Sequence, residues 1–239
     1  LFREVQLKLS SPLLYNAVYT IRAEGIPDCN GNRMSAGETK AGRPKDPQPG
    51  EVVVNEILFN PKPNGEDYVE IYNPGRQVTD LSRLYIANRN SSGVISSIKV
   101  LSTVPFYIYP GEYLAFTEAP DQLPLYYLVR FPERVMSLSS PPSFPDEEGR
   151  VILLNGQGTL IDEVPYKDEW HFRLINNKEG VALERLDPAG ASDKPNNWHS
   201  AASTAGYGTP GYQNSQYRAA DTAAVVIKVS PVIFSPDND

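Results

Sequence analysis

The stretch EVVVNEILFNPKPNGEDYVEIYNPG, residues 51–75, decides the fold. Two runs that are rich in β-branched and aromatic residues, Val52 to Phe59 and Tyr68 to Tyr72, flank a gap of Pro, Asn and Gly. Strand-forming runs on either side of a turn-rich gap predict an antiparallel pair of strands. We therefore expect this stretch to form the first hairpin of an all-β domain.

Period-two alternation predicts which side chains of this hairpin face the core. The residues expected to face inward are Val53, Ile57 and Phe59 on the first strand and Val69 and Ile71 on the second. The same alternation turns Glu70 and Tyr72 outward. One face of the hairpin is therefore apolar and predicts a second layer packed against it.

Similar runs recur along the chain. Further strands are predicted at Arg83 to Ala87, Val94 to Leu101, Tyr113 to Thr117, Arg150 to Leu154, Leu160 to Val164 and Val181 to Arg185. Short strands separated by turn residues are typical of a β-sandwich. The 22 Pro, 17 Gly and 14 Tyr among 239 residues agree with many short strands and several modules.

Charge and hydropathy exclude several classes of partner. The net charge is −7, which disfavours contact with a phosphate backbone, so no nucleic-acid partner is expected. No apolar run approaches the roughly 18 residues of a membrane helix, and the chain reads as part of a longer protein. Cys29 is the only cysteine and therefore forms no internal disulfide, and we expect it to be a small buried apolar side chain.

Several short motifs follow one another in the central part of the chain. They are Val53 with Asn55-Glu56-Ile57, Tyr68 to Pro74, Pro110 to Tyr113, Gly180 to Arg185, Asn197-Trp198-His199 and Gly208 to Asn214. In this order they resemble one known family, the lamin tail domain. The resemblance covers roughly Glu51 to Tyr217 and implies an immunoglobulin-like β-sandwich. Two departures are Tyr68, where bacterial members often carry Trp, and the Pro- and Tyr-rich run Leu123 to Pro145, whose topology stays open.

The two ends resemble parts of other exported modules. Residues 1–36 are similar to the last strands of a bacterial Ig-like domain, and residues 37–50, with almost no apolar side chain, are expected to be a linker. The resemblance implies that residues 51–217 form the lamin-tail-like sandwich, and residues 218–239 are expected to be a linker and the first strand of a following module. Val229 to Asp239 resembles the start of modules on gliding-motility and type IX secretion cargo of Bacteroidetes, which implies a secreted or outer-membrane surface location.

Acidic residues supply the candidate metal ligands. Glu56 and Glu70 lie on strands that should be neighbours, so a cation between them is one reading and hydrogen bonds to loop amides are the simpler one. Asp237 and Asp239 have the alternating oxygens that open a calcium loop, but further ligands would have to follow the last residue. We therefore expect no cofactor and no strong metal site.

Aromatic residues supply the candidate ligand-binding surface. Trp170 with Tyr126, Tyr127 and Phe131 could form an exposed platform for a sugar. The only histidines, His171 and His199, could in principle ligate zinc, but their spacing matches no ligand motif, and a core Trp198 with an outward His199 is the simpler reading.

Two functional hypotheses follow. The sequence has no Gly-x-Ser-x-Gly elbow, so we expect no enzyme activity. The first hypothesis is a non-catalytic structural or adhesive module of an exported, cell-surface bacterial protein. The alternative is an accessory glycan-binding module of a secreted multidomain enzyme. The sequence leaves the partner, a protein or a glycan, unnamed.

Overall fold

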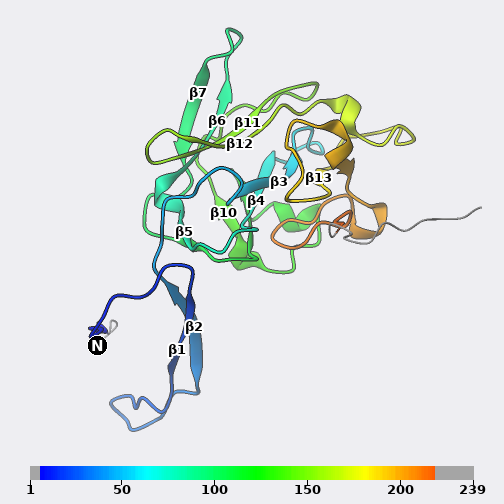
Figure 1. The fold of residues 1–239 in the computed structure, drawn as a ribbon. Helices are drawn as coiled ribbons and strands as arrows, with labels where there is room; N and C mark the ends of the chain where they lie inside the picture. Colours follow the sequence, from blue (N-terminus) through cyan, green and yellow to red (C-terminus); the bar gives the residue numbers. More distant parts are fainter. Residues whose placement is uncertain (1–5, 219–239) are drawn as a thin grey trace, which may run out of the picture.

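The first predicted hairpin is present and lies in the middle of the larger of two sheets in the computed structural model, which describes residues 6–218 (Figure 1). The larger sheet consists of β3 Val53–Leu58, β4 Tyr68–Tyr72, β9 Tyr113–Thr117, β10 Val135–Ser137, β13 Leu183–Arg185 and β14 Trp198–Ser200. The strand order is β10-β9-β4-β3-β13-β14, and β10 pairs with β9 in parallel while the other pairs are antiparallel.

A second, four-stranded sheet is antiparallel throughout. Its strands are β6 Leu84–Arg89, β7 Ile95–Val100, β11 Val151–Asn155 and β12 Leu160–Val164, in the order β12-β11-β6-β7. A short pair joins β5 Thr79–Asp80 with β8 Tyr107–Ile108. The helices described are 3₁₀ turns: η1 Leu81–Arg83, η2 Leu123–Leu125, η3 Pro132–Arg134, η4 Asp168–Trp170, η5 Pro195–Asn197 and η6 Ser203–Ala205.

The two sheets enclose one main core. The larger sheet contributes Val54, Ile57, Val69 and Ile71, and the smaller contributes Leu84, Ile86, Val151 and Leu153. Complete burial of an aliphatic side chain of this size contributes roughly 1.5–3 kcal/mol. The predicted all-β sandwich is therefore confirmed.

A bulge in β3 corrects the predicted pattern of inward residues. The pairing of β3 with β4 shifts between Val54 and Glu56, so one extra residue enters the strand. Because the extra residue changes the alternation, Val54 and Ile57 both enter the main core, and the prediction that Val53 does so was wrong. The predicted inward residues Val69 and Ile71 are both in the core.

The outer face of the larger sheet is also covered. Leu123 and Tyr127, in the run that the family motifs left open, pack on Leu58, Tyr68 and Ala182. Because this face is buried as well, the prediction that Glu70 points to solvent was wrong, and its exposed fraction is 0%. Tyr72, its neighbour on the same strand, is half-buried and stacks on Tyr113 with ring centroids 4.3 Å apart.

The N-terminal part of the chain forms a separate hairpin. β1 Val18–Ala23 pairs with β2 Gly37–Gly42 over six residues, and the hairpin extends away from the two sheets (blue in Figure 1). The first part of the segment predicted to be a linker is therefore a strand. Its side chains bury little apolar surface, but pairing with β1 provides partners for its backbone N–H and C=O groups. Lys40 Nζ lies 2.5 Å from Glu112 Oε1 of the sandwich, and Tyr109 Oη donates to the Lys40 carbonyl at 2.9 Å.

Two further predictions concern single features. Cys29 is exposed in the turn of this hairpin, so the expectation that it is buried was wrong. None of the helices within residues 6–218 has the length and apolar character needed to cross a membrane. The predicted strand after residue 218, with Asp237 and Asp239, lies outside the described residues.

Candidate functional site

Three carboxylates lie side by side across the middle of the larger sheet. Glu56 on β3 is the direct cross-strand partner of Glu70 on β4 and of Glu184 on β13. All three side chains are fully buried. Like charges in directly opposed positions repel each other, so this row requires compensation.

Compensation comes from residues 208–216, which we call the closing segment. Its backbone N–H groups donate to all three carboxylates: Thr209 to Glu56 at 2.9 Å, Gly211 to Glu70 at 2.6 Å, and Ser215 and Gln216 to Glu184 at 3.1 and 2.8 Å. Tyr68 Oη donates to Glu56 at 2.9 Å, and Asn55 Nδ2 donates to Glu70 at 2.8 Å. The carboxylates therefore hold the closing segment onto the sheet.

The site retains protons at neutral pH. Burial, reinforced by Glu184, raises the pKa of Glu56 to about 8, and burial beside Glu56 raises the pKa of Glu70 well above its ordinary value. The Thr209 hydroxyl lies 3.1 Å from Glu56 Oε2 and 2.9 Å from Glu184 Oε1. Because a hydroxyl has one hydrogen, it can donate to only one of them, and a proton on Glu56 Oε2 satisfies the other contact.

This arrangement agrees with the simpler reading of Glu56 and Glu70. Both carboxylates accept from loop and side-chain donors, so their polar atoms are occupied by the protein itself. Within residues 6–218 no group of three or more His, Cys, Asp or Glu side chains has the arrangement of a metal site. Sequence reasoning missed Glu184 and Thr209 as partners, although both stand in the family motifs.

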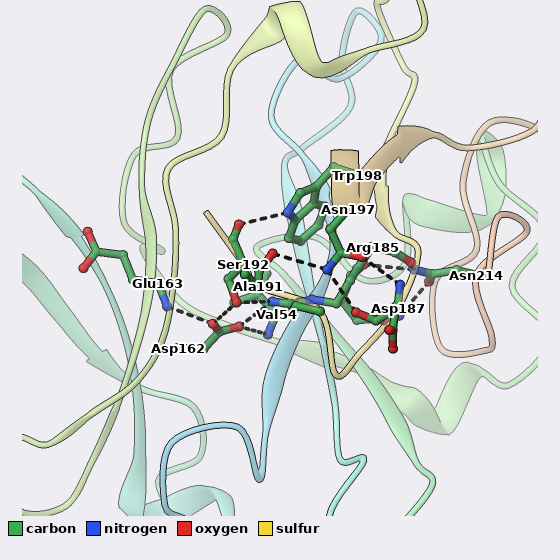
Figure 2. Close-up of polar contacts among 12 residues, drawn as sticks. Val54, Asp162, Glu163, Arg185, Asp187, Ala191, Ser192, Asn197, Trp198 and Asn214 are labelled. Carbon is green, nitrogen blue, oxygen red and sulfur yellow. Dashed lines mark hydrogen bonds and ion pairs between the residues drawn. The ribbon is translucent and has the colours of Figure 1, made fainter. Parts of the chain in front are cut away.

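A buried ion pair joins the two sheets. Arg185 on β13 and Asp162 on β12 point toward each other, with Nη2 and Oδ2 2.8 Å apart, and their side chains are only 1% and 7% exposed (Figure 2). Arg185 Nε donates to the Val54 carbonyl at 2.7 Å, and the Val54 N–H donates to Asp162 at 2.8 Å. The Ser192 hydroxyl accepts from Arg185 Nη2 at 2.7 Å and also contacts Asp162. Burial lowers the pKa of Arg185, and Asp162 opposes that shift.

The four aromatic residues predicted to bind sugar do not form one surface. Trp170 packs against the main core, with its ring centroid 6.3 Å from that of Trp198. Tyr127 is buried on the outer face of the larger sheet and donates to the Gly180 carbonyl at 3.0 Å, and the half-buried Tyr126 packs beside it. Phe131 is 38% exposed and stacks on the Arg134 guanidinium.

The two histidines lie in different environments. His171 is buried, and its Nδ1 lies 2.9 Å from the Ser200 hydroxyl, which also accepts from the Phe172 N–H. Burial lowers the pKa of His171 to about 4, so its imidazole is neutral at physiological pH. His199 is half-buried, with its ring centroid 5.3 Å from that of Phe172. The Ser200 hydroxyl therefore accepts a backbone hydrogen bond, from the Phe172 N–H, and has a structural role.

A polar groove of about 560 Å³ lies at one end of the smaller sheet. Arg89 and Asn90 at the turn after β6, Arg150 before β11, and Lys167 after β12 contribute to its walls. None of the four aromatic candidates lines it. Sequence reasoning gave no signal for this groove, because its residues come from three separate turns.

Comparisons with known proteins identify the sandwich. The family model described as Lamin Tail Domain matches residues 45–168, just over half of the chain. No curated protein matches. Among eight matching solved chains is the crystal structure of a DUF4876 family protein from Bacteroides thetaiotaomicron, with 11% identity, a TM-score of 0.37, and coverage of 84% of this chain and 81% of that one. On the strength of the family match, the chain belongs to the lamin tail domain family, whose immunoglobulin-like sandwich its two sheets form.

Proposed function

We propose that this protein is a non-catalytic structural module of an exported bacterial surface protein, in which it holds neighbouring segments at a fixed spacing or presents them for adhesion. The observation that carries the proposal is the attachment of the closing segment. Backbone amides of Thr209, Gly211 and Ser215 bond carboxylates on the central strands β3, β4 and β13. The exit from the sandwich is thereby anchored in its centre.

The entry to the sandwich is anchored as well. The Lys45 N–H donates to the Val78 carbonyl at 3.0 Å, and Lys40 forms an ion pair with Glu112. The Tyr109 hydroxyl bonds the backbone of β2 in the same region. Because both ends of the module are anchored to the sandwich, it can hold the segments before and after it at a fixed distance.

Buried polar groups support a structural role over a catalytic one. The perturbed groups Glu56 and Glu70 are enclosed by the closing segment, and His171 packs beside the Phe59 ring. A catalytic site needs titratable groups that converge on an accessible pocket. None of these three lines the polar groove. Export and surface location rest on the resemblance of Val229 to Asp239 to secretion-associated modules.

A distance measurement tests the spacer. Spin labels on the native Cys29 and on Tyr217→Cys report the separation of the hairpin turn from the end of the sandwich. We expect one narrow distance distribution in the native protein and a broader one in Lys40→Gln, which breaks the Lys40–Glu112 pair. Lys194→Gln, which removes a surface pair with Asp193, is the matched control. A broad distribution in the native protein would refute the spacer.

Location has its own test. Protease added to intact cells of the native bacterium should degrade a surface protein and leave cytoplasmic markers intact. Recovery of the protein only inside lysed cells contradicts the proposed export. Hydrolytic turnover by the purified chain contradicts the non-catalytic assignment.

The alternative, an accessory glycan-binding module, is favoured by one observation, the polar groove. The aromatic residues predicted for it, Trp170, Tyr126, Tyr127 and Phe131, remain proposals. Phe131 is the most exposed of them, so Phe131→Ala tests this surface without opening the core. Loss of glycan-array binding in Phe131→Ala would favour a binding site at Phe131 over the groove.

A further inference from the structure

The walls of the polar groove carry an excess of positive charge. Its lining residues include the cations Arg89, Arg150 and Lys167 but only one carboxylate, that of Glu148. The chain as a whole has a net charge of −7, so this local sign is opposite to that of the molecule. Coulombic attraction would therefore draw an anionic group to this place on an otherwise acidic surface.

Two arginines that line the groove, Arg89 and Arg150, share one carboxylate, that of Glu163. Arg89 binds Glu163 through both Nε and Nη2, at 2.8 and 2.7 Å, and Arg150 Nη1 binds the same carboxylate at 2.8 Å. The Glu163 side chain is 15% exposed, and the two arginines hold its pKa below the ordinary value. Arg89 and Arg150 carry two positive charges and Glu163 carries one negative charge, so the three side chains together have a net charge of one positive unit.

This triad leaves one arginine available. Arg89 uses its remaining Nη1 to donate to the Gly93 carbonyl at 2.9 Å, so its donors serve the fold. Arg150 bonds only through Nη1 within residues 6–218, and its side chain is 47% exposed. Because the hydrogen bond to Glu163 restrains the Arg150 side chain, part of its ordering precedes ligand binding, which lowers the entropic cost of binding.

The other lining residues supply mixed donors and acceptors. Glu148 and Lys167 face each other through a backbone bridge, and their side chains form a 2.9 Å ion pair. Asn90 and Ser91 contribute an amide and a hydroxyl from the turn. A polyhydroxylated ligand matches such a mixture, because each hydroxyl both donates and accepts. A volume of about 560 Å³ lies in the size range of small-ligand sites.

We propose that this groove binds a carboxylated saccharide, with the uronate carboxylate on the free edge of Arg150 and the sugar hydroxyls on Ser91, Asn90 and Glu148. The negative charge of the rest of the surface disfavours long polyanions such as nucleic acids. A saccharide whose carboxylates are spaced by neutral ring atoms places one charge in the groove. This inference goes beyond the spacer function and does not depend on it.

Calorimetric titration with a galactose oligosaccharide that carries one terminal galacturonic acid tests the groove in the full chain. We expect binding that weakens as salt is added and that the neutral galactose oligosaccharide of equal length fails to reproduce. Arg150→Gln should bind roughly tenfold to a hundredfold more weakly, the usual loss for a charge-assisted hydrogen bond. Lys167→Gln should weaken binding less, because Glu148 shares its charge.

Arg83→Gln is the matched control. Arg83 forms a 2.7 Å pair with Asp46, and it precedes β6 whereas Arg89 ends that strand. The control should bind like the native protein. Equal binding of the neutral oligosaccharide, unchanged binding by Arg150→Gln, or no binding by the native protein would each overturn the proposal. The spin-label distances would be unaffected by any of these results, so the two proposals fail separately.

Discussion

Glu56 and Glu70 are direct cross-strand partners in the centre of the larger sheet, and both are fully buried. Two carboxylates in that relationship are stable only if donors reach them and protons remain on them. The closing segment supplies the donors. The retained proton links the stability of the fold to pH.

Stability should fall as pH rises through neutrality. The folded pKa of Glu56, about 8, lies above its ordinary value of 4.5, so the folded state binds this proton more tightly than the unfolded state. The resulting stabilisation is complete below about 4.5 and is lost as pH rises through about 8. Asp67, with a pKa raised to about 7 by burial and by Asp146, acts with the same sign. Urea unfolding across this range measures the change, and a rising free energy of unfolding would contradict it.

Glu56→Gln should flatten this pH dependence. A glutamine carbonyl can accept from Tyr68 and Thr209 as Oε1 does, and its amide can donate to the Thr209 hydroxyl as a protonated carboxyl would. The variant should therefore exceed the native protein in unfolding free energy above about pH 8. Glu163→Gln is the control, because its pKa is lowered by Arg89 and its removal should leave the alkaline slope in place. A native-like slope in Glu56→Gln would show that the proton resides elsewhere.

Thr209→Val should loosen the closing segment. The substitution keeps the shape of the side chain but removes the hydroxyl between Glu56 and Glu184. Leaving buried partners unsatisfied costs about 1–3 kcal/mol, measurable by chemical unfolding. Thr209→Ser retains the hydroxyl and should lose less. An equal or larger loss in Thr209→Ser would mean that the hydroxyl contributes no more than the methyl group.

Breaking the Arg185–Asp162 pair should be strongly destabilising. Arg185→Met leaves the buried Asp162 carboxylate without its cation, and removal of one partner of a buried pair costs about 3–5 kcal/mol. Adding Asp162→Asn to this variant should cost less than the sum of the single losses, because the two residues are coupled. Unfolding of both single variants and the double variant completes the cycle. If the losses of the two single variants add up to the loss of the double variant, the ion pair does not contribute to the stability of the fold.

Gly208→Ala should push the closing segment away from the sheet. A Cβ atom at this position would lie 2.6 Å from Tyr127 Cδ1 and 2.7 Å from Tyr68 Oη, both in buried side chains. Overpacking of this kind costs about 1–3 kcal/mol. Gly156→Ala, whose nearest neighbour would be 3.7 Å away, is the control and should unfold like the native protein. A thermal melt distinguishes the two variants.

Local patterns predicted most of the strands. Tyr68–Tyr72, Tyr113–Thr117 and Leu160–Val164 have the predicted bounds, because each is a short run with β-branched or aromatic residues that lies between turn residues. The bulge in β3 was not predictable, since alternation carries no mark of one inserted residue. The strand Gly37–Gly42 was also missed, because its stability comes from pairing with β1 and not from apolar side chains of its own.

The candidate site was predictable only in part. Neighbouring strands were enough to place Glu56 beside Glu70. Their burial was not apparent, because the residues that cover them lie far along the chain. Thr209 is 153 residues away from Glu56. The groove was invisible for a similar reason, since Arg89 and Glu163 are separated by 74 residues and meet only through the register of β6, β11 and β12.

The late position of the closing segment in the chain has a consequence for biogenesis. Until Gly208 to Gln216 has left the ribosome, three acidic side chains on the central strands lack their amide donors. A nascent chain that ends before residue 208 should therefore fail to reach the native state, which can form only once the closing segment has been synthesised.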